Sequence, residues 1–230
     1  MRTVFVNGGV GFIGHHLCLE LKSQGWEVFA IDNMKQLRFH SEAKFYQRFV
    51  DERISLLEEN NIEIINLDMS ESDPYFLLLQ KYEPELVYHM SAIASAAICH
   101  KRPDWAFSEN MVNLERILHQ INKTKLKSKI VFASSSVAYG EFGGKSVNEE
   151  RQLNPINIYG LLKKNGEELV KLYGDNYGIP YSIVRPSALY GPRCVNRRVS
   201  QILIENVLDN KPVKLFGGGV EKLDFTFVDD

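Results

Sequence analysis

The segment from residue 157 to 168, NIYGLLKKNGEE, places a tyrosine and a lysine four positions apart. On a helix, this spacing puts Tyr159 and Lys163 on the same face, one turn apart. A neighbouring ammonium group favours the phenolate and lowers the pKa of the tyrosine from about 10 toward the working pH. Tyr159 is therefore a candidate general base, although the same pair occurs on many amphipathic helices that have no catalytic role.

Three consecutive serines form a second candidate group. Ser134, Ser135 and Ser136 directly follow an apolar run at 130–133 that we predict to be a strand. Ligands of α/β proteins bind at the carboxyl ends of parallel strands. A hydroxyl group there can hydrogen-bond the reacting oxygen of a substrate, whereas the simpler interpretation is three solvated capping residues. Tyr159 and Lys163 favour the first interpretation, because they follow Ser135 within 30 residues.

A glycine-rich turn lies near the start of the chain, in the sequence VNGGVGFIGHH at 6–16. Gly8, Gly11 and Gly14 are three positions apart, between a predicted strand and a helix predicted to begin near Phe12. The turn lacks the Lys-Ser/Thr that follows a nucleotide-triphosphate loop. A strand–turn–helix of this kind can hold a pyrophosphate, because its backbone permits close approach and the helix N-terminus offers unpaired N–H groups. A purely structural turn is the alternative.

Acidic residues follow the next two predicted strands. Asp32 lies 18 positions after Gly14, close to the offset of about 20 at which a carboxylate binds the ribose hydroxyls of NAD. A carboxylate there repels the 2′-phosphate of NADP, so we expect NAD, although Lys35 and Arg38 could offset the repulsion. Asp68 could reach the adenine amine or could simply cap the end of its strand.

These side chains must be positioned by a regular set of elements. Helix-spaced segments alternate with six strand-like runs, at 3–6, 28–31, 62–67, 86–90, 130–133 and 181–184. Helices are indicated around 45–57, 105–121 and 161–173. This alternation predicts an α/β, Rossmann-like, doubly wound parallel sheet. The rhythm changes after Tyr190, where we expect a helix at 199–208 and a glycine turn at 217–219 between two short strands. We therefore predict a cofactor-binding domain at 1–186 and a smaller substrate unit at 187–230.

Composition excludes several classes of partner. The 230 residues carry a formal net charge of −2, so we expect neither nucleic acid nor an anionic membrane as a partner. No apolar run approaches the ~18 residues of a membrane span. The three cysteines, Cys18, Cys99 and Cys194, are widely spaced and indicate free thiols in a reducing cytoplasm. We expect no metal site, because the histidines lack ligand spacing, and we expect His89 to make a structural hydrogen bond.

Four segments occur in a family-specific order: GGVGFIG at 8–14, SSSVAYG at 134–140, YGLLKKNGE at 159–167 and RPSALYGPR at 185–193. Together they resemble the NAD-dependent epimerase/dehydratase family, which acts on nucleotide sugars, and the resemblance runs from Thr3 to Asp230. It implies Ser135, Tyr159 and Lys163 as catalytic residues. It implies an NAD-binding set that comprises Gly8, Gly11, Phe12, Ile13, Gly14, Asp32, Asn33, Asp68, Met69, Ser91, Asn110, Tyr159 and Lys163.

The resemblance also helps to choose a reaction. Dehydratases of the family carry an Asp-Glu pair directly after the catalytic serine or threonine, where this chain has Ser136 and Val137. This difference favours epimerisation of a nucleotide sugar, most simply a UDP-sugar, through a transient 4-keto intermediate. A dehydratase, a 4-keto reductase and a non-catalytic NAD-binding regulatory protein are the alternatives. Ser136 and Arg193 are the candidate substrate contacts.

Three positions depart from the family pattern. Ala97 and Leu223 stand where many members have arginine, and Ala188 stands where many have asparagine. Family members also continue past the segment that resembles DFTFVDD, so we expect the natural protein to extend beyond Asp230. In the family, the helices corresponding to 105–121 and 161–173 pair across a two-fold axis. The resemblance therefore implies a homodimer.

Overall fold

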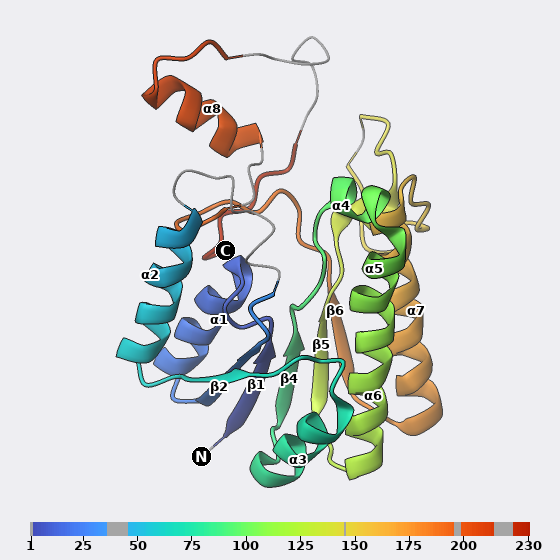
Figure 1. The fold of residues 1–230 in the computed structure, drawn as a ribbon. Coiled ribbons are helices and arrows are strands. Elements are labelled where there is room, and N and C mark those ends of the chain that lie inside the picture. Colours follow the sequence, from blue (N-terminus) through green and yellow to red (C-terminus); the bar gives the residue numbers. More distant parts are fainter. Residues whose placement is uncertain (1, 36–45, 145, 196–198, 214–222) are drawn as a thin grey trace.

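Short runs of β-branched and aromatic residues form six parallel strands at the centre of the molecule (Figure 1). The computed structural model describes residues 2–35, 46–144, 146–195, 199–213 and 223–230. The strand order is β3-β2-β1-β4-β5-β6, which confirms the predicted doubly wound, Rossmann-like sheet. The strands are β1 (Thr3–Asn7), β2 (Glu27–Asp32), β3 (Glu63–Asn66), β4 (Leu86–His89), β5 (Lys129–Ala133) and β6 (Tyr181–Val184).

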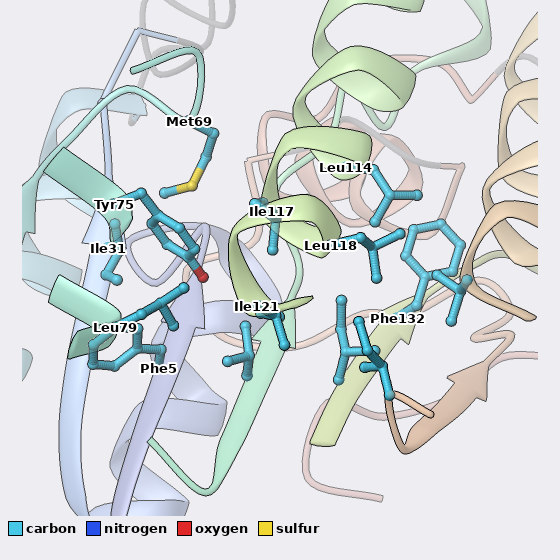
Figure 2. Packing of buried hydrophobic residues seen from close by; sticks show 14 of the residues in the cluster. Phe5, Ile31, Met69, Tyr75, Leu79, Leu114, Ile117, Leu118, Ile121 and Phe132 are labelled. Atoms are coloured by element: carbon cyan, nitrogen blue, oxygen red, sulfur yellow. The ribbon is translucent and has the colours of Figure 1, made fainter. Parts of the chain in front are cut away.

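Helices cover both faces of the sheet because its interior strands, such as β1 with every residue buried, bury side chains on both sides. Phe5 of β1 belongs to a core that includes α3 (Ser72–Tyr82), α6 (Asn113–Thr124) and α7 (Ile158–Tyr177). Figure 2 shows part of this core, in which Tyr75 and Leu79 of α3 lie near Phe5. Val4 and Val6 contribute instead to a core with α1 (Phe12–Ser23) and α2 (Tyr46–Glu59).

The segment expected as one helix around 105–121 is divided into three parts. After α4 (Ala96–Lys101) come α5 (Pro103–Phe107), a single wide π-helical segment η2 (Ser108–Val112), and then α6. The apolar spacing was correct, but periodicity alone does not reveal a π-helical segment. Such segments are frequent at functional sites. Here η2 carries Asn110, one of the residues predicted to contact the cofactor.

The end of the chain is partly as expected. The helix predicted at 199–208 is present as α8 (Val199–Leu208). Where the second of the two short strands beside the glycine turn was expected, an isolated β-bridge joins Tyr190 to Phe227. The predicted glycine turn at 217–219 lies outside the described residues, as does Arg38. Three further basic residues of the C-terminal part, Arg197, Arg198 and Lys222, also lie outside them. Within the described part of the chain, no helix is long and apolar enough to cross a membrane.

Candidate functional site

The glycine-rich turn has the geometry of a phosphate cradle. Gly8 has a φ of 81°, and a β-carbon there would lie 2.8 Å from the Ser91 backbone nitrogen. A β-carbon on Gly14 would lie 2.1 Å from the Gly8 carbonyl oxygen, so the helix can approach the turn only without a side chain. No side chain caps α1, whose N-cap is Gly11. The backbone N–H groups of Phe12 and Ile13 therefore remain available to an anion at the helix N-terminus.

Asp32 lies beside this turn, at the end of β2. Its Oδ2 atom accepts a hydrogen bond from the Val10 N–H at 3.1 Å, and Oδ1 accepts one from Met34 at 2.8 Å. Burial raises the pKa of the Asp32 carboxyl above its ordinary value, and these two hydrogen bonds reduce the rise. The carboxylate thus both shapes the turn and lies next to it, as binding of an adenosine ribose would require.

Asp68 is held by its own neighbours. Its carboxylate accepts hydrogen bonds from the Lys35 ammonium group, from Asn33 Nδ2 at 3.2 Å and from the Ser70 N–H at 2.8 Å. Burial alone would raise the pKa of Asp68, but the bonds from Lys35 and Ser70 hold it well below its usual range. The bond to Ser70 agrees with the strand-end capping interpretation. Lys35, one of the two cations considered for a 2′-phosphate, is paired with Asp68.

The three serines after β5 have three different roles. Ser134 Oγ donates to Glu167 Oε1 at 2.5 Å, and Ser136 Oγ donates to Ser187 Oγ at 3.2 Å. Ser135 caps the short helix η3 (Ser136–Tyr139), because its Oγ accepts from the Val137 N–H at 3.3 Å. Accepting this bond leaves the Ser135 O–H able to donate to a substrate oxygen. Ser136, a predicted substrate contact, links η3 to the segment after β6 through this bond.

Tyr159 and Lys163 lie on the same buried face of α7, as their spacing predicted. Lys163 is 4% exposed as a residue. Its ammonium group donates to the Ala133 carbonyl at 2.6 Å and lies 5.9 Å from the centre of the Tyr159 ring. Burial lowers the pKa of Lys163 from 10.5 to about 8. The lysine is therefore still charged at pH 7. Its ammonium group lies at the end of β5, directly before the three serines.

Two further predicted cofactor contacts lie on the segment after β4. Asn110 on η2 accepts from the Ile93 N–H at 2.8 Å and donates to its carbonyl at 3.4 Å. This reciprocal pair fixes the backbone that follows Ser91, which itself lies against Gly8. Met69, another predicted cofactor contact, follows β3 instead; it is 5% exposed and lies near Tyr75 in the core (Figure 2).

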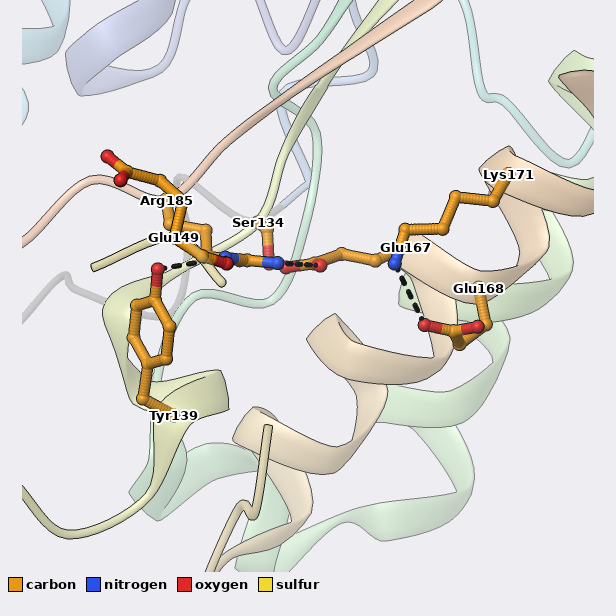
Figure 3. Close-up of polar contacts among 7 residues, drawn as sticks. All are labelled: Ser134, Tyr139, Glu149, Glu167, Glu168, Lys171 and Arg185. Atoms are coloured by element: carbon orange, nitrogen blue, oxygen red, sulfur yellow. Dashed lines mark hydrogen bonds and ion pairs between the residues drawn. The ribbon is translucent and has the colours of Figure 1, made fainter. Parts of the chain in front are cut away.

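A buried ion pair anchors α7, and the sequence analysis did not identify it. Glu167, fully buried, pairs with the Arg185 guanidinium at 2.6 and 2.8 Å (Figure 3). Arg185 also donates to Tyr139 Oη at 2.8 Å and to the Glu149 carbonyl at 3.0 Å. Glu167 lies one turn after Lys163, so this network fixes the face of α7 that carries Lys163 relative to the ends of β5 and β6. The sequence signal that could have identified Glu167 was its position four residues after Lys163, on the same face of the helix.

Arg193, the second predicted substrate contact, points toward α1. Its Nε donates to His15 Nε2 at 2.9 Å. His89 was expected to make a structural hydrogen bond. Its ring instead stacks on Phe132, with the ring centroids 6.1 Å apart, and its Nδ1 is buried with no hydrogen-bond partner among the described residues. The same part of the chain contains no cluster of three His, Cys, Asp or Glu side chains that could hold a metal ion.

Comparison with known proteins places this geometry in context. The sequence is 32% identical over 236 residues to YtcB of Bacillus subtilis (strain 168), named an uncharacterized UDP-glucose epimerase; the match covers 99% of this chain and 69% of that protein. The fold matches UDP-glucuronic acid 4-epimerase from Bacillus cereus, solved with UDP-glucuronic acid and NAD, with a TM-score of 0.86 and 31% identity. That match covers 99% of this chain and 70% of the other.

A second solved structure differs in its sugar. UDP-N-acetylglucosamine 4-epimerase from Methanobrevibacter ruminantium M1 matches with a TM-score of 0.83 and 26% identity, over 99% of this chain and 69% of that one. Residues 4–230 match the sequence pattern of the NAD dependent epimerase/dehydratase family. The phosphate cradle, the acid beside it and the Tyr–Lys pair agree with that match. This chain belongs to the NAD-dependent epimerase/dehydratase family.

Proposed function

We propose that this chain catalyses the NAD-dependent 4-epimerisation of a UDP-sugar. The observation that carries the proposal is that the glycine turn and Ser135 both lie at the carboxyl ends of the parallel strands. Lys163 bonds to the last residue of β5 at this edge, and Tyr159 lies one helical turn before it on α7. The named relatives act on glucose, glucuronic acid and N-acetylglucosamine derivatives, which differ at C2 and C6. Their names share the UDP group, and reaction at C4 is common to the two solved epimerases, so these two features transfer to the proposal.

The glycine turn and Asp32 fit NAD. The N–H groups of Phe12 and Ile13 would bind its pyrophosphate, and the Asp32 carboxylate would bind the adenosine ribose. When bound, NAD supplies an acceptor and donor of hydride for the C4 carbon of the sugar. Asn33, Asp68, Met69, Ser91 and Asn110 complete the proposed binding surface.

The chain's own residues handle the proton and orient the sugar. Tyr159 takes the proton from the C4 hydroxyl group and later returns it, as a general base and then a general acid. The Lys163 ammonium group, held by the Ala133 carbonyl, stabilises the phenolate that acts as the base. Ser135 donates a hydrogen bond to the same sugar oxygen. Neither Ser136 nor Val137 carries the acid that elimination of water would need, so epimerisation is favoured over dehydration.

Assembly and location are further parts of the proposal. Phe107 on α5, and Leu161 and Leu172 on α7, are about half exposed, at 54%, 46% and 55%. Burial of these side chains against a second copy supports a homodimer. Light scattering should then give the dimer mass for the natural chain and the monomer mass for Leu172→Asp. We place the protein in the cytoplasm because its three cysteines are free thiols.

The test is incubation with NAD and, separately, with UDP-glucose, UDP-glucuronic acid and UDP-N-acetylglucosamine. An epimerase gives an isomer of unchanged mass, which NMR distinguishes at C4, whereas a dehydratase product loses the mass of water. Tyr159→Phe should lower turnover by about 10²–10⁴-fold with little change in NAD affinity, because only the proton acceptor is removed. Tyr177→Phe, on the exposed end of α7, is the matched control and should keep full activity.

Two results would contradict the proposal. Tyr159→Phe that keeps more than about half of the natural turnover would remove the assigned base. Calorimetry provides the second test, because Asp32→Ala should weaken NAD more than NADP through loss of the ribose contact. Unchanged NAD affinity in that variant would remove Asp32 from the site.

A further inference from the structure

Arg53 on α2 is a fully enclosed cation with two distant partners. It is 1% exposed. Its Nη1 atom donates to the Val10 carbonyl at 3.2 Å, and Nη2 donates to the Arg193 carbonyl at 2.5 Å. Val10 belongs to the glycine turn, whereas Arg193 belongs to the segment after residue 187. One side chain therefore joins the cofactor cradle to the loop that enters the proposed substrate unit.

His15 makes a second connection between the same two segments. Its Nδ1 lies 2.9 Å from the Gly11 carbonyl, which can only accept, so Nδ1 carries the proton. In the neutral ring, Nε2 then accepts the hydrogen bond from Arg193 Nε at 2.9 Å. Burial lowers the pKa of His15 to about 3, so the ring is neutral at pH 7 and this pattern of donors holds.

The residue that both connections hold is strained. Arg193 has a φ of 60°, in the left-handed region, which is unfavourable for a residue with a β-carbon. Such conformations persist where the surroundings hold them in place. Arg53 binds the carbonyl of Arg193 and His15 binds its guanidinium, so main chain and side chain are both fixed.

Opening of the loop at residues 190–195 would therefore also change the contacts of the glycine turn. If residues 190–195 move away, Arg53 loses its hydrogen bond to the Arg193 carbonyl, one of the two carbonyl partners that the structure describes, which is unfavourable. The remaining partner is Val10, whose N–H donates to Asp32. A ligand that binds only the conformation in which Arg53 joins the turn to the loop favours that conformation by mass action, and so it stabilises the loop contacts as well.

We propose that Arg53 and His15 are positioning residues that couple NAD binding at the glycine turn to the ordering of the loop at residues 190–195. The proposal rests on the proposed function in assigning this loop to the substrate side. By linkage, the coupling is reciprocal: closing the loop strengthens NAD binding by the same factor. The cofactor thereby organises the entrance of the substrate unit before a sugar nucleotide arrives.

Hydrogen exchange measured by mass spectrometry tests the coupling through the amides of Tyr190 and Cys194. These amides donate to the Thr226 and Gly191 carbonyls, so their exchange reports loop opening. In the natural chain, NAD should slow exchange in both the turn and the loop. In Arg53→Met, NAD should slow exchange in the turn alone. Without NAD, this variant should exchange in the loop about tenfold faster than the natural chain.

A matched control lies on the same helix. Arg48 pairs with Glu52 at 2.9 Å with its side chain 73% exposed, so Arg48→Met should leave both responses as in the natural chain. If Arg53→Met does not fold, Arg53→Lys and His15→Gln replace it; each removes one connection, and each should speed loop exchange without NAD.

Each remaining outcome decides the matter. Loop exchange that is the same in the natural chain and the variants without NAD overturns the proposal, whether or not NAD binds. Protection of the turn by NAD with no protection of the loop in the natural chain also overturns it. An absence of any NAD effect, together with faster loop exchange in Arg53→Met, would retain the connection but contradict the proposed function.

Discussion

Replacing Glu167 by glutamine removes one charge from the buried pair that anchors α7. Glu167 is fully buried, and the Arg185 side chain that faces it is 16% exposed. The glutamine is similar in size and keeps a carbonyl oxygen that can accept from Ser134 or Arg185. The change therefore isolates the loss of charge from the loss of packing.

The expected loss of stability follows from burial. Breaking a buried ion pair by removing one partner costs about 3–5 kcal/mol, because the other charge is left without compensation. Arg185 retains its bonds to Tyr139 and to the Glu149 carbonyl, so we expect the lower end, about 3 kcal/mol. If the free energy of unfolding falls by about 3 kcal/mol per molar of urea, the urea concentration at the unfolding midpoint falls by about 1 M.

The neighbouring residue provides the control. Glu168 pairs with Lys171 at 3.0 Å on the exposed side of the same helix (Figure 3). Because solvent screens this pair, Glu168→Gln should cost less than about 1 kcal/mol. Urea unfolding followed by circular dichroism measures both variants. Equal losses in the two variants would refute the view that the Glu167–Arg185 pair anchors α7.

Three further predictions concern pH and the glycine turn. Burial lowers the pKa of His89 from 6.5 to about 3, so the folded state loses stability as pH falls below 6.5; between pH 7 and 4.5 the natural chain should lose about 3 kcal/mol more than His89→Gln in urea unfolding. The exposed variant His100→Gln should behave as the natural chain, and equal acid sensitivity in His89→Gln would contradict the assignment. Because burial lowers the pKa of Lys163 from 10.5 to about 8, the unfolded chain binds more protons between these values, and stability should rise by about 2 kcal/mol from pH 8 to 10. That gain should be absent in Lys163→Met and present in Lys164→Met, and a gain that survives in Lys163→Met would exclude Lys163 as its source. Gly14→Ala should abolish NAD binding in calorimetry, since its β-carbon would meet the Gly8 carbonyl at 2.1 Å, whereas Gly11→Ala, with 2.9 Å, should bind more weakly but measurably; comparable affinities would contradict the role of close packing.

Features that depend on neighbours in the sequence were predictable. Runs of β-branched residues identified all six strands, and the helix start at Phe12 was correct, because buried parallel strands and glycine turns have local signatures. The Tyr159–Lys163 pair was predictable for the same reason, since helical spacing alone places the two side chains together. The ordered motifs then identified the family.

Features that depend on contacts between distant segments were not predictable. The Glu167–Arg185 pair joins α7 to the end of β6, and Arg53 meets Arg193 from an element 140 positions away. No local pattern marks these partners, because each is selected by the topology of the sheet. The π-helical segment at Ser108–Val112 was missed because its apolar spacing matches that of an ordinary helix closely.

The strand order has a consequence for synthesis of the protein. β1 is made first but lies in the interior of the sheet, where Val4 pairs with both Val28 and Leu86. A nascent chain can form the β1–α1–β2 unit early, yet the other edge of β1 stays open until β4 has left the ribosome. An open edge beside apolar side chains is a template for association with other chains. Substitutions that slow the docking of α3 or β4 should therefore lower the yield of native protein in cells even where the finished molecule is hardly destabilised.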